Sequence, residues 1–240
     1  MKKLILFCLV AFCGVFCTGC ADADEFEILE WTTHHWVDEY VEVDGFSLEL
    51  DGDRVFVRFT PKTYYPSNEL YSLFTTHKSK ERVYQNSDVA TFNAIAERNG
   101  DGNYNSKLQY MTMRNCRDFE AISYNSALSR NIAKIEVYSE NDYDEEHPAN
   151  TLLNDLVTAT ISSFGKLISK KDIQPHTNDS CSKKCDYTEK LLKDVTAEDL
   201  AVLNFVSLKF EKLSKVKQNI TVTITFDDGE VFTDTVEVNF

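Results

Sequence analysis

Three cysteines follow the N-terminal segment, and their thiols could form disulfides or bind metal: Cys116, Cys181 and Cys185. The short spacing between Cys181 and Cys185 suits a local disulfide across a turn, which forms in an oxidising compartment. An odd number of cysteines leaves at least one thiol free or paired outside the chain. His176 lies nearby and makes zinc coordination a further alternative, but no fourth ligand is visible. The spacing favours a disulfide between Cys181 and Cys185 over free thiols, and both over a metal site.

Three other groups of polar residues have types that bind metal ions. The acidic residues and the histidine of 142–147 could gather a hard cation, although solvated loop charges are the favoured interpretation. Residues 99–105 carry oxygen side chains at alternate positions, but Tyr104 stands where a calcium loop needs glycine, which favours a simple turn. His34 and His35 are neighbours and would point to opposite sides of a strand. We therefore expect no metal ion and no cofactor.

The sequence contains no catalytic motif with recognisable spacing. Neither G-x-S-x-G nor H-E-x-x-H is present. With 39 Asp and Glu residues, opposed carboxylates suitable for glycoside hydrolysis would arise by chance. The net charge of −14 repels phosphate backbones, so nucleic acid is not an expected partner. The sequence favours a non-catalytic binding or accessory protein, with a hydrolase acting on extracellular polymers such as glycans as the alternative.

The N-terminus has the pattern of an export signal. Lys2 and Lys3 precede an apolar run that is too short to span a bilayer, and Thr18, Gly19 and Cys20 follow it. Small residues before a cysteine resemble a bacterial lipobox, in which the cysteine receives lipid and becomes the first mature residue. We predict that residues 1–19 are a signal peptide and that Cys20 is the lipidation site and the only membrane anchor.

The elements that position these residues are mostly strands. Apolar and polar residues alternate as in half-buried strands, most clearly where Ile220, Val222 and Ile224 alternate with threonines. The firm strands are predicted at 46–50, 54–60, 132–139, 205–211, 219–226 and 230–239, and weaker ones near 28–30, 108–113 and 158–163. One-sided alternation predicts a mainly β fold, a two-layer antiparallel immunoglobulin-like β-sandwich with short helical insertions.

Helices, loops and domains follow from the remaining signals. Helical spacing predicts a short helix at 88–98, and Thr196 with Asp199 has the spacing of a capping box. Pro61 and Pro66 are expected to end the second strand, and 169–193 is expected to be a surface excursion. The predicted organisation is an acidic lipid tether over 20–27 and one β-sandwich domain over 28–240, with two subdomains divided near residue 130 as the alternative.

Two stretches resemble a known family. Residues 132–156, with a strand, His147-Pro148 and Leu153-Asn154-Asp155, are similar to a segment of Bacteroides-type surface lipoproteins of unknown function. The C-terminal residues 220–240 resemble the end of the same proteins. The resemblance implies an outer-membrane or cell-surface location and gives no activity.

Aromatic residues outside the clear strand patterns are the predicted contact surface. Tyr64 and Tyr65 stand in a polar, tyrosine-rich segment, and exposed rings stack on sugars or anchor protein interfaces. We expect a glycan or an envelope protein as the partner, and the lipid on Cys20 as the link to the membrane.

Overall fold

The computed structural model describes residues 26–68, 89–102, 106–113, 125–169, 185–210 and 217–239. For the strands at 26–33 and 106–113, only the backbone is described. The predicted lipidation site Cys20 and the signal peptide lie outside these residues. So do Cys116, His176 and Cys181.

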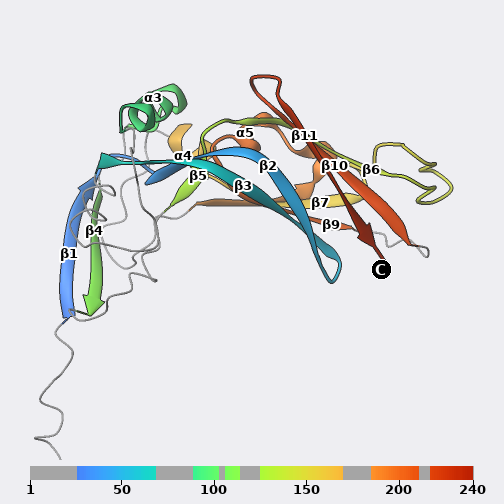
Figure 1. The fold of residues 1–240 in the computed structure, drawn as a ribbon, viewed down its shortest axis with the longest axis horizontal. Coiled ribbons are helices and arrows are strands. Elements are labelled where there is room, and N and C mark those ends of the chain that lie inside the picture. The colour runs from blue at the N-terminus through green and yellow to red at the C-terminus, as the bar shows by residue number, and fades with distance from the viewer. Residues whose placement is uncertain are drawn as a thin grey trace, which may run out of the picture.

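The chain is built mainly of strands, with a few short helices between them (Figure 1). The strands are β1 (Phe26–Thr33), β2 (Glu39–Asp51), β3 (Arg54–Pro66), β4 (Ser106–Met113), β5 (Ser126–Leu128), β6 (Ile132–Ser139), β7 (Val157–Ser163), β8 (Asp186–Leu191), β9 (Leu203–Phe210), β10 (Gln218–Phe226) and β11 (Val231–Val238). The helices are α3 (Val89–Asn99), α4 (Gly165–Ser169) and α5 (Ala197–Leu200), with a 3₁₀ turn, η2, at Leu192–Asp194. The predicted mainly β class is confirmed.

Two sheets enclose the main core. One has six strands in the order β5-β2-β3-β9-β7-β8, and the other has three in the order β11-β10-β6. Strands β1 and β4 form a separate two-stranded ladder. Among the described strands, every pairing is antiparallel except that of β5 with β2, which is parallel.

Strict alternation explains why the two larger sheets pack face to face. In β10, Ile220, Val222 and Ile224 are fully buried while the threonines between them are half-buried. Their apolar faces meet the inward residues of the large sheet, such as Val55 and Leu208, in one cluster. This arrangement confirms the predicted β-sandwich. The cluster draws on residues from both sides of residue 130, so a subdomain boundary there would cut through it.

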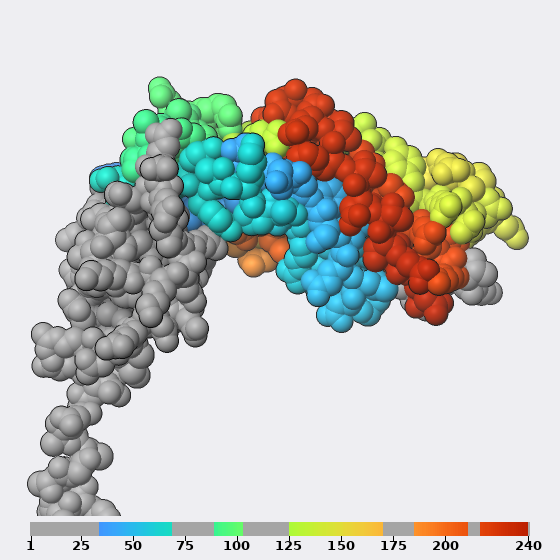
Figure 2. Space-filling model, viewed as in Figure 1, coloured from blue at the N-terminus to red at the C-terminus, as the bar shows by residue number. Residues whose placement is uncertain are grey.

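The two sheets also approach each other along one edge. Strand β11 lies beside β2, and the backbone N–H of Leu48 donates to the carboxylate of Asp234 over 2.9 Å. Figure 2 shows the two segments side by side on the surface, β2 in blue and β11 in red. A side-chain acceptor thus satisfies an edge group that no strand partner could reach.

Strand β3 runs further than the sequence indicates. The strand was expected to end at residue 60, before Pro61, yet β3 passes Pro61, remains paired with β2 and ends only at Pro66. The register of β2 against β3 shifts on both sides of Val43, which lies opposite Pro61. A proline fits at such a bulge because the ladder hydrogen bond is interrupted there anyway.

The stretch 169–193 also contains more structure than predicted. Its last part forms strand β8, which pairs with β7 at the edge of the large sheet. Only one neighbour covers an edge strand, so its sequence can stay polar and resemble a loop.

Candidate ligand-binding pocket

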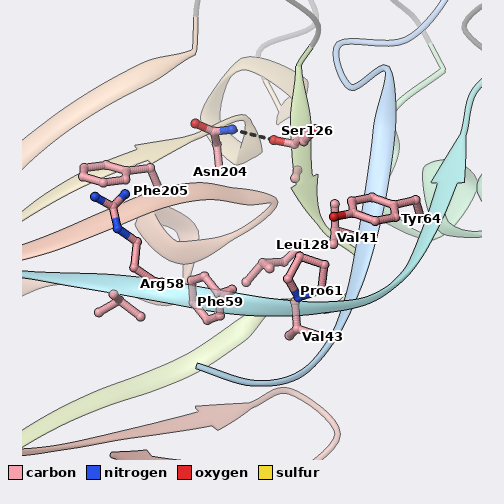
Figure 3. Close-up of a pocket in the computed structure, with 12 residues that line it drawn as sticks. Val41, Val43, Arg58, Phe59, Pro61, Tyr64, Ser126, Leu128, Asn204 and Phe205 are labelled. Atoms are coloured by element: carbon pink, nitrogen blue, oxygen red, sulfur yellow. Dashed lines mark hydrogen bonds between the residues drawn. The ribbon is translucent and has the colours of Figure 1, made fainter. Parts of the chain in front are cut away.

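A pocket of about 270 Å³ opens on the large sheet where four strands meet (Figure 3). It is lined by Val41 and Val43 of β2, Val57, Arg58, Phe59, Pro61 and Tyr64 of β3, Ser126, Ala127 and Leu128 of β5, and Asn204 and Phe205 of β9. Figure 3 shows Arg58 and Phe205 together at one end and Tyr64 with Val41 at the other.

The pocket exists because β3 and β9 separate. Their ladder runs only from Arg54↔Lys209 to Phe56↔Ser207. Beyond it, β3 stays with β2 up to Pro66, whereas β9 stays with β7. The free end of β9 reaches β5 instead, where the Asn204 amide donates to the Ser126 carbonyl over 2.6 Å. The diverging strands leave a gap that no described strand fills.

Arg130 fixes the part of β2 around Val43, which lines the pocket. Its guanidinium donates to the carbonyl of Val43 over 3.2 Å, at the irregular part of β2. The same group pairs with Asp228 over 2.9 Å and with Glu230, and it lies over the ring of Phe226. Arg130 therefore connects the irregular part of β2 to the turn between β10 and β11, and the three-stranded sheet supports this side of the pocket.

The floor of the pocket is part of the protein core. Val43, Val57 and Leu128 are buried members of the main cluster, and Phe59 is half-buried against the same cluster. An occupant would therefore contact core side chains directly, which favours apolar groups.

The charged and polar groups at the rim already have partners. Arg58 forms an ion pair with Glu49 over 2.8 Å and lies over the ring of Phe56. Ser126 donates its hydroxyl to the buried carboxylate of Glu39 over 3.0 Å. The rim is therefore close to neutral, and the pocket offers mostly shape and apolar area.

The structure separates the two tyrosines of the predicted contact surface. Tyr64 lines the pocket. Tyr65 instead packs beside a second, smaller core cluster, the cluster under α3, and donates to Glu42 over 2.7 Å. The buried members of this cluster are Val37, Tyr40, Phe92, Ile95, Ala96, Ala127, Phe164 and Val202. Glu42 also pairs with Lys62 over 2.8 Å, and these two hydrogen bonds, the one from Lys62 first, lower the pKa of Glu42.

Sequence reasoning did not identify Arg58, Asn204 or Phe205 as site residues. Phe205 left a detectable signal, because its neighbour Val206 points into the core and alternation therefore turns an aromatic ring outward. Asn204 and Arg58 left none. Their position depends on where β3 and β9 part.

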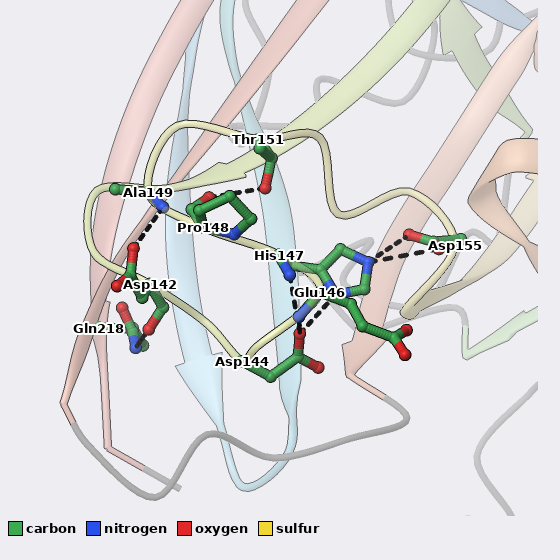
Figure 4. Close-up of polar contacts among 9 residues, drawn as sticks. All are labelled: Asp142, Asp144, Glu146, His147, Pro148, Ala149, Thr151, Asp155 and Gln218. Atoms are coloured by element: carbon green, nitrogen blue, oxygen red, sulfur yellow. Dashed lines mark hydrogen bonds and ion pairs between the residues drawn. The ribbon is translucent and has the colours of Figure 1, made fainter.

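The acidic loop with His147 is held together by internal bonds (Figure 4). His147 Nδ1 lies 2.7 Å from Asp144 Oδ1, and its Nε2 lies 3.3 Å from both oxygens of Asp155. Asp142 accepts the backbone N–H of Ala149 over 2.8 Å. Within the described part of the chain, no group of His, Cys, Asp and Glu is arranged to hold a metal ion.

The calcium-like stretch after α3 uses its carboxylate in the fold. Asp101 is buried and accepts hydrogen bonds from the N–H groups of Trp36 and Val37 and from the Tyr40 hydroxyl, over 2.6, 3.1 and 3.1 Å. Burial raises the pKa of Asp101, while the two backbone donors oppose the rise. His35 Nδ1 contacts the Asp101 carbonyl, and His34 is exposed. Asp101 therefore joins the end of α3 to the start of β2.

Cys185 has no disulfide partner among the described residues and packs beside the cluster under α3. Its predicted disulfide partner, Cys181, is outside the described residues, so the pairing stays a prediction. None of the described helices is long and apolar enough to span a membrane.

Comparison of the chain with protein-family models, with curated proteins and with solved structures finds no match.

Proposed function

We propose that this protein is an exported, lipid-anchored lipoprotein of the cell envelope, at the outer membrane or cell surface, that binds a ligand without chemical turnover. The single observation that carries the binding role is the pocket between β3, β5 and β9, which opens to core side chains. The signal-like N-terminus ending in Cys20 supports the location.

The composition of the pocket supports binding over catalysis. Among the described lining residues there is no carboxylate and no histidine, so an acid–base pair would have to come from elsewhere. The Ser126 hydroxyl is bonded to Glu39, which leaves it without the imidazole that activates a serine nucleophile. Apolar walls with few polar groups are typical of sites that hold a ligand by shape.

The anchoring half of the proposal is tested in the native host. Cys20→Ser should abolish fatty-acid labelling and shift the protein from the membrane to the soluble fraction, because no other segment is proposed to anchor it. Unchanged labelling and membrane association would contradict it.

The binding half is tested with the immobilised full chain, purified in mild detergent and exposed to glycans, mucin and envelope extracts. We expect saturable retention that Tyr64→Ala weakens and that the matched variant Tyr65→Ala leaves unchanged, since only Tyr64 lines the pocket. Turnover of any polymer by the purified protein would overturn the proposal in favour of a hydrolase.

A further inference from the structure

We infer that the occupant of the pocket is an extended segment of a partner protein, which adds as a β-strand to the free edge of β3 and places an uncharged aliphatic side chain in the pocket. This inference rests on the proposed binding function.

The backbone groups of Val57 and Phe59 point into the gap. Asp51 and Arg54 face each other across a two-residue turn, so alternate β3 residues from Arg54 onward bond to β2. The residues between them, which include Val57 and Phe59, point their N–H and C=O groups away from β2 and toward the side of β9. The bond from Phe210 N–H to the Asp53 carbonyl, 3.3 Å long, confirms this parity on the β9 side.

The backbone N–H and C=O of Phe59 lack a strand partner in the described part of the chain. The β3–β9 ladder ends at the non-hydrogen-bonded pair Phe56↔Ser207, which the Val57 N–H closes toward Val206, so the free edge begins at the Val57 carbonyl. Val57 and Phe59 are also lining residues of the pocket, so the free edge and the apolar cavity coincide. An extended peptide supplies both complements at once, because main-chain groups pair with the edge and alternate side chains enter the pocket.

The charge around the pocket selects an uncharged segment. The cations nearest to the pocket on β3 are Arg58 and Lys62, and each is neutralised by a glutamate of β2 over 2.8 Å. A charged side chain entering the pocket would lose its hydration without gaining a free counter-charge. The branched side chains of Val41, Val43 and Leu128 instead complement valine, isoleucine or leucine.

A sugar fits these observations less well. Glycan recognition needs several polar side chains that can turn toward hydroxyl groups, whereas the Asn204 amide is held by Ser126 over 2.6 Å. A free acyl chain would fill the cavity but would leave the strand edge unpaired.

The test uses the full chain in mild detergent and a blocked seven-residue peptide in which valine alternates with threonine, labelled with a fluorophore. Fluorescence anisotropy should show saturable binding, and methylation of the valine backbone nitrogens should weaken it by about tenfold because edge hydrogen bonds are lost. Equal binding of both peptides would overturn the inference.

A pair of variants tests the same edge from the protein side. Phe59→Ala and Phe59→Pro both remove the ring, but only proline removes the N–H that faces the gap, and the ladder to β2 does not use that N–H. Peptide binding should be about tenfold weaker in Phe59→Pro than in Phe59→Ala. Equal affinities of two folded variants would contradict the inference, and if the proline variant does not fold, the methylated peptide decides.

Failure of this inference is distinguishable from failure of the proposed function. If decanoate or maltoheptaose binds in a manner sensitive to Tyr64→Ala while the peptide does not bind, the pocket is a binding site and the strand-addition inference is wrong. If none of the three probes nor any component of the envelope extracts binds in that manner, both are wrong.

Discussion

His147 is the clearest example of a single side chain that organises a loop. Its contact with Asp144 is the main cause of its raised pKa, with burial opposing the rise and Asp155 adding to it. A raised folded-state pKa means that the folded protein holds the proton more tightly. The stabilisation is therefore complete below the unfolded pKa, about 6.5, and is lost as the pH rises through the folded pKa.

We predict that His147→Gln lowers the free energy of unfolding by about 1 kcal/mol at about pH 5.5, and by less at about pH 8.5. Urea unfolding of both proteins at the two pH values measures the difference. Asp144→Asn should show the same pH dependence, since it removes the nearer carboxylate. A cost that is the same at both pH values would contradict this account of the loop.

Asp199 is a buried carboxylate with two lysine partners. Its oxygens lie 2.7 Å from Lys166 Nζ and 2.6 Å from Lys190 Nζ, and the Thr196 N–H donates to it over 2.8 Å. Burial alone would raise the pKa of Asp199, but the ion pairs and the hydrogen bonds together hold it well below its usual range. Its contribution is therefore present above the unfolded pKa and is lost as the pH falls through the folded pKa.

Replacing Asp199 by asparagine should cost about 2 kcal/mol of stability at neutral pH, because it removes both ion pairs and weakens the cap of α5. The neighbouring Glu198 is exposed, so Glu198→Gln is the matched control and should change stability by less than about 0.5 kcal/mol. Chemical denaturation of the two variants tests the pair. Similar costs for both would show that the buried ion pairs are not stabilising.

Short-range signals identified this cap from the sequence. Thr196 and Asp199 have capping-box spacing, and both reciprocal bonds are present in the structure. Lys166 and Lys190 were not identified as partners of Asp199. They lie on α4 and β8, and sequence spacing does not show that these elements approach Asp199 in the fold.

Among the elements, α4 and α5 depend on a close approach at Gly165. A Cβ added there would lie 2.6 Å from the Ala201 Cβ and 2.9 Å from the Ala201 carbonyl oxygen. The backbone at Ala201 cannot move away from Gly165 at low cost, because it lies between α5 and the start of β9.

Gly165→Ala should therefore destabilise the protein by about 2 kcal/mol through overpacking. Gly45→Ala is the matched control, because nothing lies within 4 Å of a Cβ at that position in β2. Thermal melts should show a clear decrease for the first variant and a change within about 0.5 kcal/mol for the second. Equal melting temperatures would mean that α4 and α5 can separate without cost.

The elements most accurately predicted were those with a buried face. Strand β10 alternates without exception, and its bounds agree with the sequence pattern to within one residue. Strands β5 and β8 were missed, since a three-residue strand has too few positions for a pattern and an edge strand stays polar. The continuation of β3 past Pro61 was also missed, because the bulge that accommodates the proline forms only when β2 pairs with it.

On the scale of the whole molecule, stability depends on the contact between two sheets. Ile224 is fully buried in β10, with Ile135 on one neighbouring strand and Phe232 on the other. Residues from β2 to β11 contribute to the same cluster. The protein should therefore unfold the two sheets together.

Ile224→Asp should cost about 4 kcal/mol or more, because it removes apolar contacts and buries a carboxylate without a partner. Thr223→Ala, on the opposite face of the same strand, should cost less than about 1 kcal/mol. Calorimetry of both variants gives the comparison. A melting temperature of Ile224→Asp equal to that of the parent would place the core elsewhere.

The pocket could be predicted from the sequence only in part. Tyr64 is predictable as a contact residue because its aromatic ring stands in a polar stretch of sequence. Phe205 is not, because it lies in a strand whose alternation indicates only which residues face the core. The gap itself results from the separation of β3 and β9 after Phe56. No local pattern encodes the point at which two strands from distant parts of the chain stop pairing.

The most direct test of the central claim is a titration of the full chain, labelled on its valine methyl groups, followed by nuclear magnetic resonance. The probes are the alternating valine–threonine peptide, decanoate and maltoheptaose. A pocket ligand should shift the signals of Val41, Val43 and Val57, which line the pocket, and leave Val231, exposed on β11, unchanged. Shifts confined to Val231, or no shift of the three lining valines with any probe, would contradict the assignment of this pocket as the binding site.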